Sequence, residues 1–476
     1  MDQYRDSRTA ARAVTCILAS LVAWTASLQA DPQPGRQPLA ITDVTVIDVE
    51  RGRSIGPRTV LIDEGRIVTI ATVRSADIPA NAQRIDGRGR FLIPGLVDMH
   101  VHLFNGYSRR PPNDWSFPLF IANGVTAVRE MNADTASIAV VNQWRKAVEA
   151  GDLIAPRILA AGVAVRGKSP DDAVRQVNAA ADAGTDFIKI FSEVPVAHWR
   201  AILDSAQARS LPVLGHVPAG VSLLASAAAG QRDNEHLMQA FEACSSAEAQ
   251  MLEQRHDLDG NAAAALRDAQ EAAVLQAFDQ RICRRVAKSL AATGQVQVPT
   301  LVLDYEDSIR RPGYLNDDAR LRYLRADERA RWDRFVASVA SGDHALEKQR
   351  WNVARQIVST FNRSAVPILS GTDAPMPGVY PGFSLHDELA LLVQSGLTPR
   401  AALRSATLSP AEFLGIAGET GSIEVGKRAD LVVLDADPTR DVRNTRRIHA
   451  LIFDGRLLRR ADLDDLFEAA AKAQAP

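Results

Sequence analysis

Short apolar runs that recur between residues 92 and 375 constrain the fold of this chain more than any other feature. Most of them are continuous apolar stretches, which is typical of parallel strands that are buried on both faces. Segments with helical character, such as 171–184, 196–209 and 385–395, lie between some of these runs. The eight candidate strands are LIPGLVDMHVHL, GVTAVREM, APRILAAGVAV, TDFIKIF, LPVLGHV, QRDNEHL, GQVQVPTLVL and AVPILSGTDAP. Eight strands that alternate with helices predict an α/β fold, a (β/α)8 TIM barrel over residues 94–423.

Two kinds of addition to the barrel are expected. Residues 242–290 and 305–360 are long, polar and rich in Arg, Ala and Glu, and we interpret them as helical insertions over the barrel mouth. Residues 38–93 and 424–460 show the alternation and turn signals of short strands. Because chain termini often lie close together, the two end segments are predicted to form one composite β-sandwich domain, from residues 31–93 and 424–476.

The charge balance excludes some classes of partner. The chain has 55 Lys and Arg against 57 Asp and Glu, which leaves a net charge of −2. This near-neutrality gives no electrostatic reason to expect nucleic acid or an anionic membrane as the main partner. The 46% apolar and 24% charged residues are typical of a globular protein. Whether the chain forms a homo-oligomer stays open.

The first thirty residues have the parts of a secretory signal peptide. Arg5, Arg8 and Arg12 precede an uncharged, mostly apolar stretch that ends at Ala30, before a polar break. A membrane anchor would need about 20 predominantly apolar residues, for which the stretch is marginal. We therefore expect cleavage after Ala30, export to the periplasm or secretion, and no stable membrane span in the mature chain.

Cysteine usage is sparse. Three cysteines are too few for a disulfide scaffold or a cysteine-based zinc module. Loss of the leader would remove Cys16 and leave Cys244 and Cys283. These two could pair in an oxidising compartment, although nothing in the sequence brings them together.

Several candidate strands end in residues that bind metals. His100 and His102 close the first run, and residues two apart in a strand point to the same side, so both imidazoles can face one ion. His216, His236 and Asp373 each fall at the end of a later run. Barrel active sites are built at the carboxyl ends of the strands. Imidazole and carboxylate ligands suit Zn²⁺, with Mn²⁺, Co²⁺ and Fe²⁺ left open.

Lys189 stands in the middle of the apolar run DFIKIF. A buried ammonium without a partner is unfavourable, so this lysine needs a salt bridge, an escape to solvent or a modification. One solution is that the neutral amine takes up carbon dioxide. The carbamate that results is anionic and offers two oxygens, which can bridge two metal ions.

These residues together resemble the amidohydrolase superfamily of metal-dependent hydrolases. The resemblance covers nearly the whole mature chain, from IPGLVDMHVHL to GSIEVGKRADLVVLD, and is similar to the subtype with two metals and a carboxylated lysine. GVTAVRE, VPTL and SLHDELALLVQSGLTPRAALRSAT are suggestive of the imidazolonepropionase-like and Xaa-Pro-dipeptidase-like branch. One departure is Arg129-Glu130, where many relatives have Arg-Asp.

The resemblance implies two divalent metal ions, with zinc favoured. His100, His102 and Asp373 would hold the more buried ion, His216 and His236 the second, and carboxylated Lys189 would bridge them. A hydroxide shared by the two ions would attack the substrate, and Asp373 would accept its proton and deliver it to the leaving nitrogen. His386, Tyr107 and Tyr305 are candidate substrate contacts. Arg109 and Arg110 read as a solvated basic loop.

Three functions follow as hypotheses. The first is an exported amidohydrolase that cleaves a C–N amide bond of a small molecule, such as a dipeptide or an N-acyl amino acid. The second is a cyclic-amide, carbamate or ester hydrolase, or a deaminase, that uses the same site. The third is a non-catalytic periplasmic binding protein that keeps a metal for stability.

Overall fold

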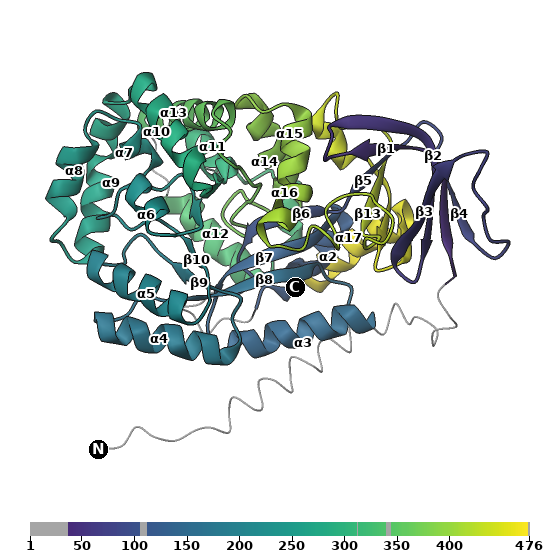
Figure 1. Ribbon diagram of the computed structural model, residues 1–476, viewed down its shortest axis with the longest axis horizontal. Coiled ribbons are helices and arrows are strands. Elements are labelled where there is room, and N and C mark those ends of the chain that lie inside the picture. The colour runs from purple at the N-terminus through teal and green to yellow at the C-terminus, as the bar shows by residue number, and fades with distance from the viewer. Residues whose placement is uncertain (1–36, 105–111, 312, 339–343, 475–476) are drawn as a thin grey trace, which may run out of the picture.

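A computed structural model of the protein describes residues 37–104, 112–311, 313–338 and 344–474 (Figure 1). The predicted signal peptide lies outside the described residues, and so do Cys16, Tyr107, Arg109 and Arg110. Among the described helices, none has both the length and the apolar character that a membrane crossing requires.

A curled parallel sheet forms the centre of the molecule. Five of its strands lie side by side in the order β10-β9-β8-β7-β6, and a sixth and a seventh, β11 and β12, form a parallel pair. These strands are almost completely buried, as their continuous apolar runs predict. Their bounds are β6 (Leu96–Val101), β7 (Val125–Ala133), β8 (Arg157–Ala164), β9 (Phe187–Ile190), β10 (Val213–Gly215), β11 (Asp233–Glu235) and β12 (Val296–Val298).

Hydrogen bonds connect the two groups of strands. The backbone N–H of Arg232, next to β11, donates to the carbonyl of Val213 in β10 at 3.1 Å. On the other side, the segment 366–374 forms parallel bridges to β12 and to β6, through Ile368 and Ala374. This mixed α/β arrangement with a curled parallel sheet is consistent with the predicted (β/α)8 barrel.

The helices predicted between strands are present to within two residues at each end. They are α4 (Pro170–Ala183), α5 (Val196–Ala208) and α14 (Phe383–Gln394). The Ser169 hydroxyl caps α4 by accepting from the N–H of Asp172, and Gly184 ends it in the left-handed conformation.

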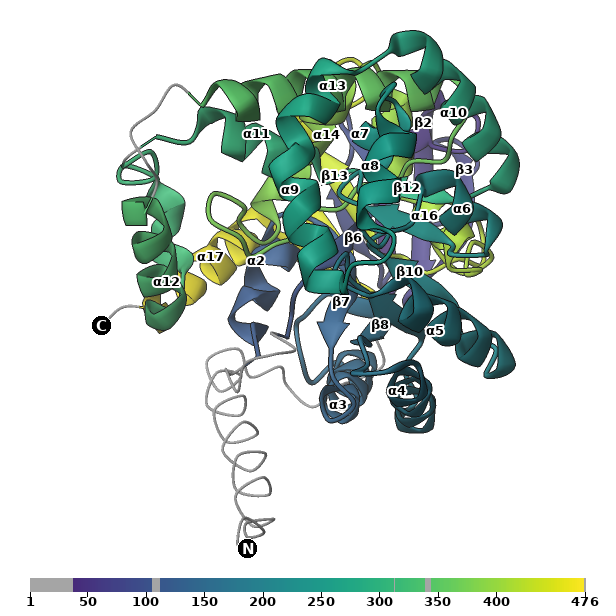
Figure 2. The same ribbon diagram turned by 90° about the vertical axis from the view of Figure 1, so that its left-hand side faces the viewer.

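The predicted insertions are also helical, and Figure 2 shows α12 apart from α8, α9 and α10, on the side of the molecule where α17 and α2 lie. They are α8 (Glu248–Arg255), α9 (Gly260–Gln276), α10 (Gln280–Thr293), α11 (Leu301–Ile309), α12 (Ala326–Ser338) and α13 (Ala345–Arg363). The other helical elements are η1 (Asp114–Ser116), α2 (Phe117–Ala122), α3 (Ser137–Ala150), α6 (Leu223–Ala228), α7 (Ala240–Ala243), η2 (Ala319–Tyr323), α15 (Pro399–Ser405), α16 (Leu408–Phe413), η3 (Val442–Arg446) and α17 (Arg460–Gln474).

Strands from both ends of the chain meet in one eight-stranded sheet, in the order β15-β14-β13-β5-β1-β2-β3, with β4 paired to β1 (Figure 1). The antiparallel pair β5–β13 joins the two ends, with Leu92 opposite Val433. The bounds are β1 (Leu39–Asp48), β2 (Arg53–Asp63), β3 (Arg66–Thr72), β4 (Gln83–Asp86), β5 (Phe91–Pro94), β13 (Leu431–Leu434), β14 (Ile448–Phe453) and β15 (Arg456–Arg459). Residues after β15 form α17, which packs against α2 and places Phe467 on the ring of Phe383.

Cys244, directly after α7, and Cys283, in α10, form a disulfide, and both are fully buried. The pairing that the sequence left open is therefore made in the structure. It ties the short helix α7, which carries Phe241 and Glu242, to the insertion helix α10.

Candidate metal centre

Three predicted ligands converge at the end of β6. The metal-binding atoms of His100, His102 and Asp373 lie within 4.8 Å of one another. Oδ1 of Asp373 is 2.6 Å from Nε2 of His102 and 3.0 Å from Nε2 of His100. Asp373 has φ 68°, a left-handed conformation that Asp tolerates better than most residues. It follows directly on the buried residues 369–372. Strand alternation and the topology thus bring together residues that are 271 positions apart.

The other two histidines continue the cluster. The ring centroids of His100 and His236 are 4.6 Å apart, and those of His236 and His216 are 4.9 Å apart. Together with His102, whose ring is 5.2 Å from that of His100, the four imidazoles form one connected group. All four predicted histidines therefore lie at one site, although they come from three separate segments of the chain, which end β6, β10 and β11.

Lys189 lies beneath this group and is fully buried. Its Nζ has no hydrogen-bond partner among the described residues, and the ring centroid of Phe191 lies 5.0 Å from it. Gly215, at φ +117°, makes room for the lysine, because a Cβ there would stand 2.6 Å from the lysine Cδ. Burial lowers the pKa of Lys189 to about 8, against the opposing attraction of Glu235, Asp233 and Asp373. A fraction of the Lys189 side chains therefore carries the neutral amine that carbamate formation needs at a pH near 7.

Three of the four imidazoles favour the neutral state that ligation needs. The exception is His102, since burial acts to lower its pKa but Asp373 outweighs burial and raises this pKa. Burial lowers the pKa of His100 to about 3, and it lowers the pKa of His216 and of His236 well below the usual value. Nδ1 of His216 is buried without a hydrogen-bond partner among the described residues. Burial alone would raise the pKa of Asp373, but His102 and His100 outweigh it and hold this pKa well below its usual range. Neutral imidazoles, an ionised carboxylate and orphaned nitrogens fit divalent metal ions.

A buried network of charged side chains, formed by Arg129, Asp233 and Glu235, contacts the ligand His100. Glu235 accepts from Nδ1 of His100 at 2.6 Å and from Arg129 Nη2 at 2.6 Å. Arg129 Nη1 also donates to Asp233 at 2.6 Å, and its Nε donates to the carbonyl of Met99 at 2.6 Å. Because Nδ1 of His100 carries the proton, its Nε2 presents a lone pair toward Asp373. A carboxylate that orients a histidine ligand in this way raises its basicity.

Two more buried carboxylates hold the backbone around the ligands. Asp98 accepts from the N–H of His100 at 3.2 Å and from the N–H and hydroxyl of Thr372 at 3.0 and 2.6 Å, so it fastens β6 to the turn that carries Asp373. Glu130 accepts from the N–H of Leu103 and, at 2.7 Å, from that of Asn132. Burial raises the pKa of Asp98 and of Glu130 to about 7. Glu130, for which the sequence suggested no role, therefore supports the chain just after His102.

The sequence reasoning missed Asp98, Arg129, Asp233 and Glu235. A usable signal was present, because each of them is a charged residue inside or at the edge of a short strand that is otherwise buried. A charge in such a run needs a partner, in the way that Lys189 was recognised.

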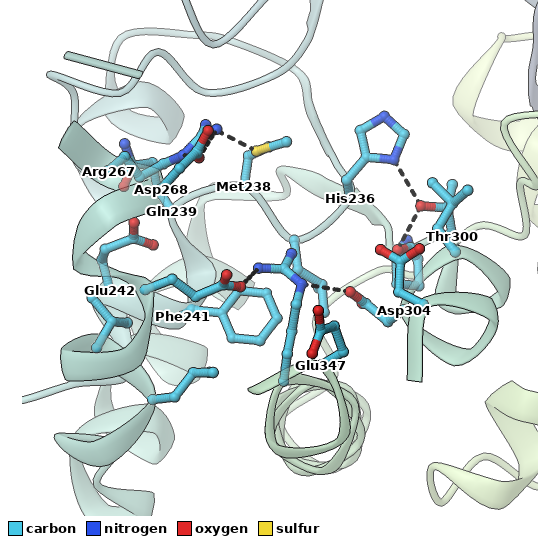
Figure 3. Close-up of a pocket in the computed structure, with 18 of the residues that line it drawn as sticks. His236, Met238, Gln239, Phe241, Glu242, Arg267, Asp268, Thr300, Asp304 and Glu347 are labelled. Carbon is cyan, nitrogen blue, oxygen red and sulfur yellow. Dashed lines mark hydrogen bonds and ion pairs between the residues drawn. The ribbon is translucent and has the colours of Figure 1, made fainter. Parts of the chain in front are cut away.

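A cavity of about 490 Å³ adjoins the candidate metal centre (Figure 3). His216, His236 and Asp373 are among the residues that line it, and much of its wall comes from α9, α11 and α13. Arg350 of α13 ties these walls together, because it bonds Glu271 of α9 and Asp304 of α11, each at 2.6 Å. Its guanidinium lies 4.2 Å from the ring centroid of Phe241. The predicted insertions thus build the substrate side of the site.

The described residues that were predicted to contact substrate, His386 and Tyr305, do not line the cavity. The prediction for His386 is wrong, because this residue is fully buried and both its ring nitrogens are bonded, to Thr445 at 2.9 Å and to the Asn123 carbonyl at 3.0 Å. Tyr305 lies on α11 but packs edge-on against Trp351 and is not among the residues that line the cavity, so its predicted role finds no support. Tyr107 lies outside the described residues.

Comparison with known proteins agrees with this site. The model of the amidohydrolase family matches residues 91–458, which span the curled sheet, the insertions and the part of the end sheet formed by β5, β13, β14 and β15. The chain belongs to the amidohydrolase family and is a hydrolase that acts on carbon–nitrogen bonds.

Individual relatives are distant. A deacetylase from Agrobacterium fabrum is 36% identical over 74 residues, which cover 15% of this chain and 18% of that protein. A dihydroorotase from Anaeromyxobacter dehalogenans is 25% identical over 423 residues, which cover 82% of this chain and 88% of that protein. Among solved structures, a Xaa-Pro dipeptidase with bound methionine superposes with a TM-score of 0.62 at 20% identity, over 89% of this chain and all of that one. This likeness shows that the two chains share a fold.

Proposed function

We propose that the protein is an exported hydrolase that uses two divalent metal ions, with zinc favoured, to cleave an amide bond of a small molecule. The observation that carries the proposal is the convergence of four imidazoles, Asp373 and a buried lysine whose Nζ has no hydrogen-bond partner among the described residues. Three members of this group, His216, His236 and Asp373, also line a cavity. His100, His102 and Asp373 would hold one ion, His216 and His236 the other, and a carbamate on Lys189 would bridge them. Bound ions of this kind lower the pKa of water and polarise a carbonyl.

The chain's own residues handle the proton. The carboxylate of Asp373 is ionised, since its pKa is held well below the usual range, and it lines the cavity. It is therefore placed to accept the proton of the attacking water and to pass it to the leaving nitrogen. Arg129 and Glu235 keep the His100 ring oriented while this happens.

The cavity walls favour a substrate with a positively charged group. Apart from Asp373, the lining includes six carboxylates and three arginines, which leaves an excess of three negative charges. An unblocked dipeptide carries an ammonium group near the scissile amide, whereas an N-acyl amino acid carries only the carboxylate. The dipeptide is therefore the preferred form of the proposed substrate. The six carboxylates are Glu242, Asp268, Glu271, Asp304, Asp307 and Glu347, and the arginines are Arg267, Arg310 and Arg350.

A second candidate function, hydrolysis of a cyclic amide, is supported by one comparison. The likeness to a dihydroorotase over most of both chains favours hydrolysis of a cyclic amide at the same site. A panel of dipeptides, their N-acetylated counterparts, N-acyl amino acids, dihydroorotate, lactams and lactones separates the two proposals. We expect higher kcat/KM for unblocked dipeptides than for the same dipeptides after N-acetylation.

The Asp373→Asn variant tests the proton-transfer role. With saturating metal, kcat should fall by about 10²–10⁴-fold, the usual contribution of a general acid–base group, while circular dichroism and Tm stay close to those of the wild type. Unchanged turnover in this variant would remove the support for the mechanism.

Export is proposed from the leader-like first thirty residues, and the buried Cys244–Cys283 disulfide agrees with an oxidising compartment. N-terminal sequencing of the protein recovered from the periplasm should begin at Asp31. A mature protein that begins at Met1 and stays in the cytoplasm would contradict this part of the proposal.

A further inference from the structure

Thr300 occupies the N-cap position of α11 but does not cap the helix. A threonine in this position normally has an extended backbone and accepts a hydrogen bond from the first turn, as Thr398 does at α15. Thr300 instead has φ 46° and ψ 47°, and its side chain makes no cap bond. For a β-branched residue this left-handed conformation is a strained exception, and such exceptions gather at functional sites.

The Thr300 hydroxyl is directed at His236 (Figure 3). It donates its one proton to the carbonyl of Pro299 at 2.8 Å, so its contact of 2.7 Å with Nδ1 of His236 is one in which the imidazole donates. His236 therefore carries its proton on Nδ1 and keeps the lone pair on Nε2. His236 is itself left-handed, at φ 57°, and its N–H donates to the carbonyl of Val298 at 3.0 Å.

The missing cap is supplied by another helix. Oε2 of Glu388, a fully buried residue of α14, accepts from the N–H of Val302 at 2.8 Å, in the first turn of α11. Its other oxygen has no hydrogen-bond partner among the described residues. A carboxyl oxygen at a helix N-terminus accepts from N–H groups that have no partner within the helix. Glu388 thus caps the N-terminus of α11 in place of the Thr300 side chain.

We propose that Glu388 and Thr300 are positioning residues for His236: Glu388 caps α11 so that the Thr300 hydroxyl is free to hold His236 with Nε2 available to a metal ion. The inference rests on the proposed function, since it concerns the ion that His216 and His236 would hold. It adds a role for two residues outside the ligand set, one of them on a helix that contributes no ligand.

The first test replaces Thr300 and measures metal binding rather than turnover. Metal-free protein is titrated with Zn²⁺ against a chelating indicator, and a His236→Ala variant identifies which dissociation constant belongs to the His216/His236 site. We expect Thr300→Val to weaken that constant by about 10–100-fold, the usual effect of losing a hydrogen-bond partner of a histidine ligand. Thr300→Ser should restore it to within about threefold, because serine keeps the hydroxyl. The constant of the site with His100, His102 and Asp373 should stay unchanged in both.

The Thr300→Gly variant separates positioning from a structural role. Glycine adopts a left-handed conformation without strain, so this change should leave Tm equal to or above that of the wild type. It also removes the hydroxyl, so the His216/His236 site should still lose affinity. Thr398→Val is the matched control, because it removes an ordinary threonine cap: it should lower Tm and leave both dissociation constants unchanged.

A second pair of variants tests Glu388. Glu388→Gln keeps an oxygen that can accept from Val302, and both metal constants should stay close to those of the wild type. Glu388→Leu removes the cap and should weaken the His216/His236 constant. If Glu388→Leu does not fold, the Thr300 set decides alone.

The outcomes distinguish this inference from the function on which it rests. Wild-type protein that binds fewer than two ions contradicts the proposed two-metal function. Wild-type protein that binds two ions, with both constants unchanged in Thr300→Val and Thr300→Gly, overturns the positioning role and leaves the proposed function standing.

Discussion

The carboxylate of Glu235 accepts from Nδ1 of His100 with one oxygen and from Arg129 with the other, at 2.6 Å in each case. All three side chains are fully buried. The ligand, its orienting carboxylate and the charge that balances this carboxylate thus form one continuous unit beneath the candidate metal centre. The unit explains how an arginine can be buried at the base of a metal site, since Asp233 and Glu235 share its charge.

Replacement of Glu235 by Gln should weaken metal binding. The amide cannot accept from both His100 and Arg129 as a carboxylate does, so the His100 ring loses its fixed orientation or the guanidinium loses a partner. We expect metal affinity or kcat/KM to fall by about 10–100-fold. Elemental analysis after dialysis and steady-state kinetics with added metal measure the two effects, and an unchanged variant would show that His100 needs no such support.

Replacement of Lys189 by Met should abolish turnover and stabilise the metal-free protein. Methionine fills a similar volume but cannot form a carbamate, so the bridging ligand is lost. Because Nζ has no hydrogen-bond partner among the described residues, its removal should raise the free energy of unfolding of metal-free protein by about 1–3 kcal/mol. Urea denaturation measures this change, with the exposed Lys288→Met as a control that should alter neither property. A Lys189→Met variant with full activity would rule out the carbamate.

The metal ligands could be predicted because they obey local rules. His100 and His102 share a side of one strand, and His216, His236 and Asp373 each end a candidate strand, so one topology places them all together. What surrounds them depends on tertiary partners. His386 follows the eighth run closely in sequence, yet α14 turns it toward Thr445 and Asn123 and away from the cavity. Nothing local distinguishes that orientation from one that faces substrate.

The cavity walls and the helix cap were beyond sequence reasoning for a similar reason. Arg350, Glu271 and Asp304 come from three helices of the insertions, and only the packing of those helices brings the charges together. Thr300 stands before α11 as an ordinary cap would, and the sequence does not show its left-handed conformation. The carboxyl that caps α11 instead belongs to Glu388, 88 residues further along. The composite β segments were simpler to foresee, since alternation at both chain ends predicted strands that needed partners.

The stability of metal-free protein should depend on Glu388 and pH. Burial raises the pKa of Glu388 from 4.5 to about 8, against the opposing N–H groups of Val302 and Leu301. Between these values the folded protein holds a proton that the unfolded chain has lost, so stability falls as pH rises, by at most about 1.4 kcal/mol per pH unit. Glu388→Gln does not titrate, and its stability relative to the wild type should therefore increase across this window and level off above it.

Urea denaturation of the metal-free proteins from pH 5 to pH 9 checks the Glu388 prediction, with the exposed Glu253→Gln as a control. A difference between Glu388→Gln and wild type that stays constant over this range would show that Glu388 does not titrate as described.

Removal of the disulfide should destabilise the protein. Cys244 and Cys283 are 39 residues apart, and closing a loop of that length in the unfolded chain corresponds to about 4 kcal/mol in the chain-entropy treatment. The Cys244→Ser, Cys283→Ser double variant should lose stability of this order in urea. Mass spectrometry with thiol labelling under denaturing conditions should find no free thiol at either position in the wild type, and two labelled thiols without reduction would refute the pairing.

The most direct test of the central claim is the metal content of the purified mature protein, measured by elemental analysis beside its amidase activity. The account predicts two divalent ions per chain, loss of activity when a chelator removes them, and recovery when Zn²⁺ is returned. Full activity in protein that holds no metal would contradict it.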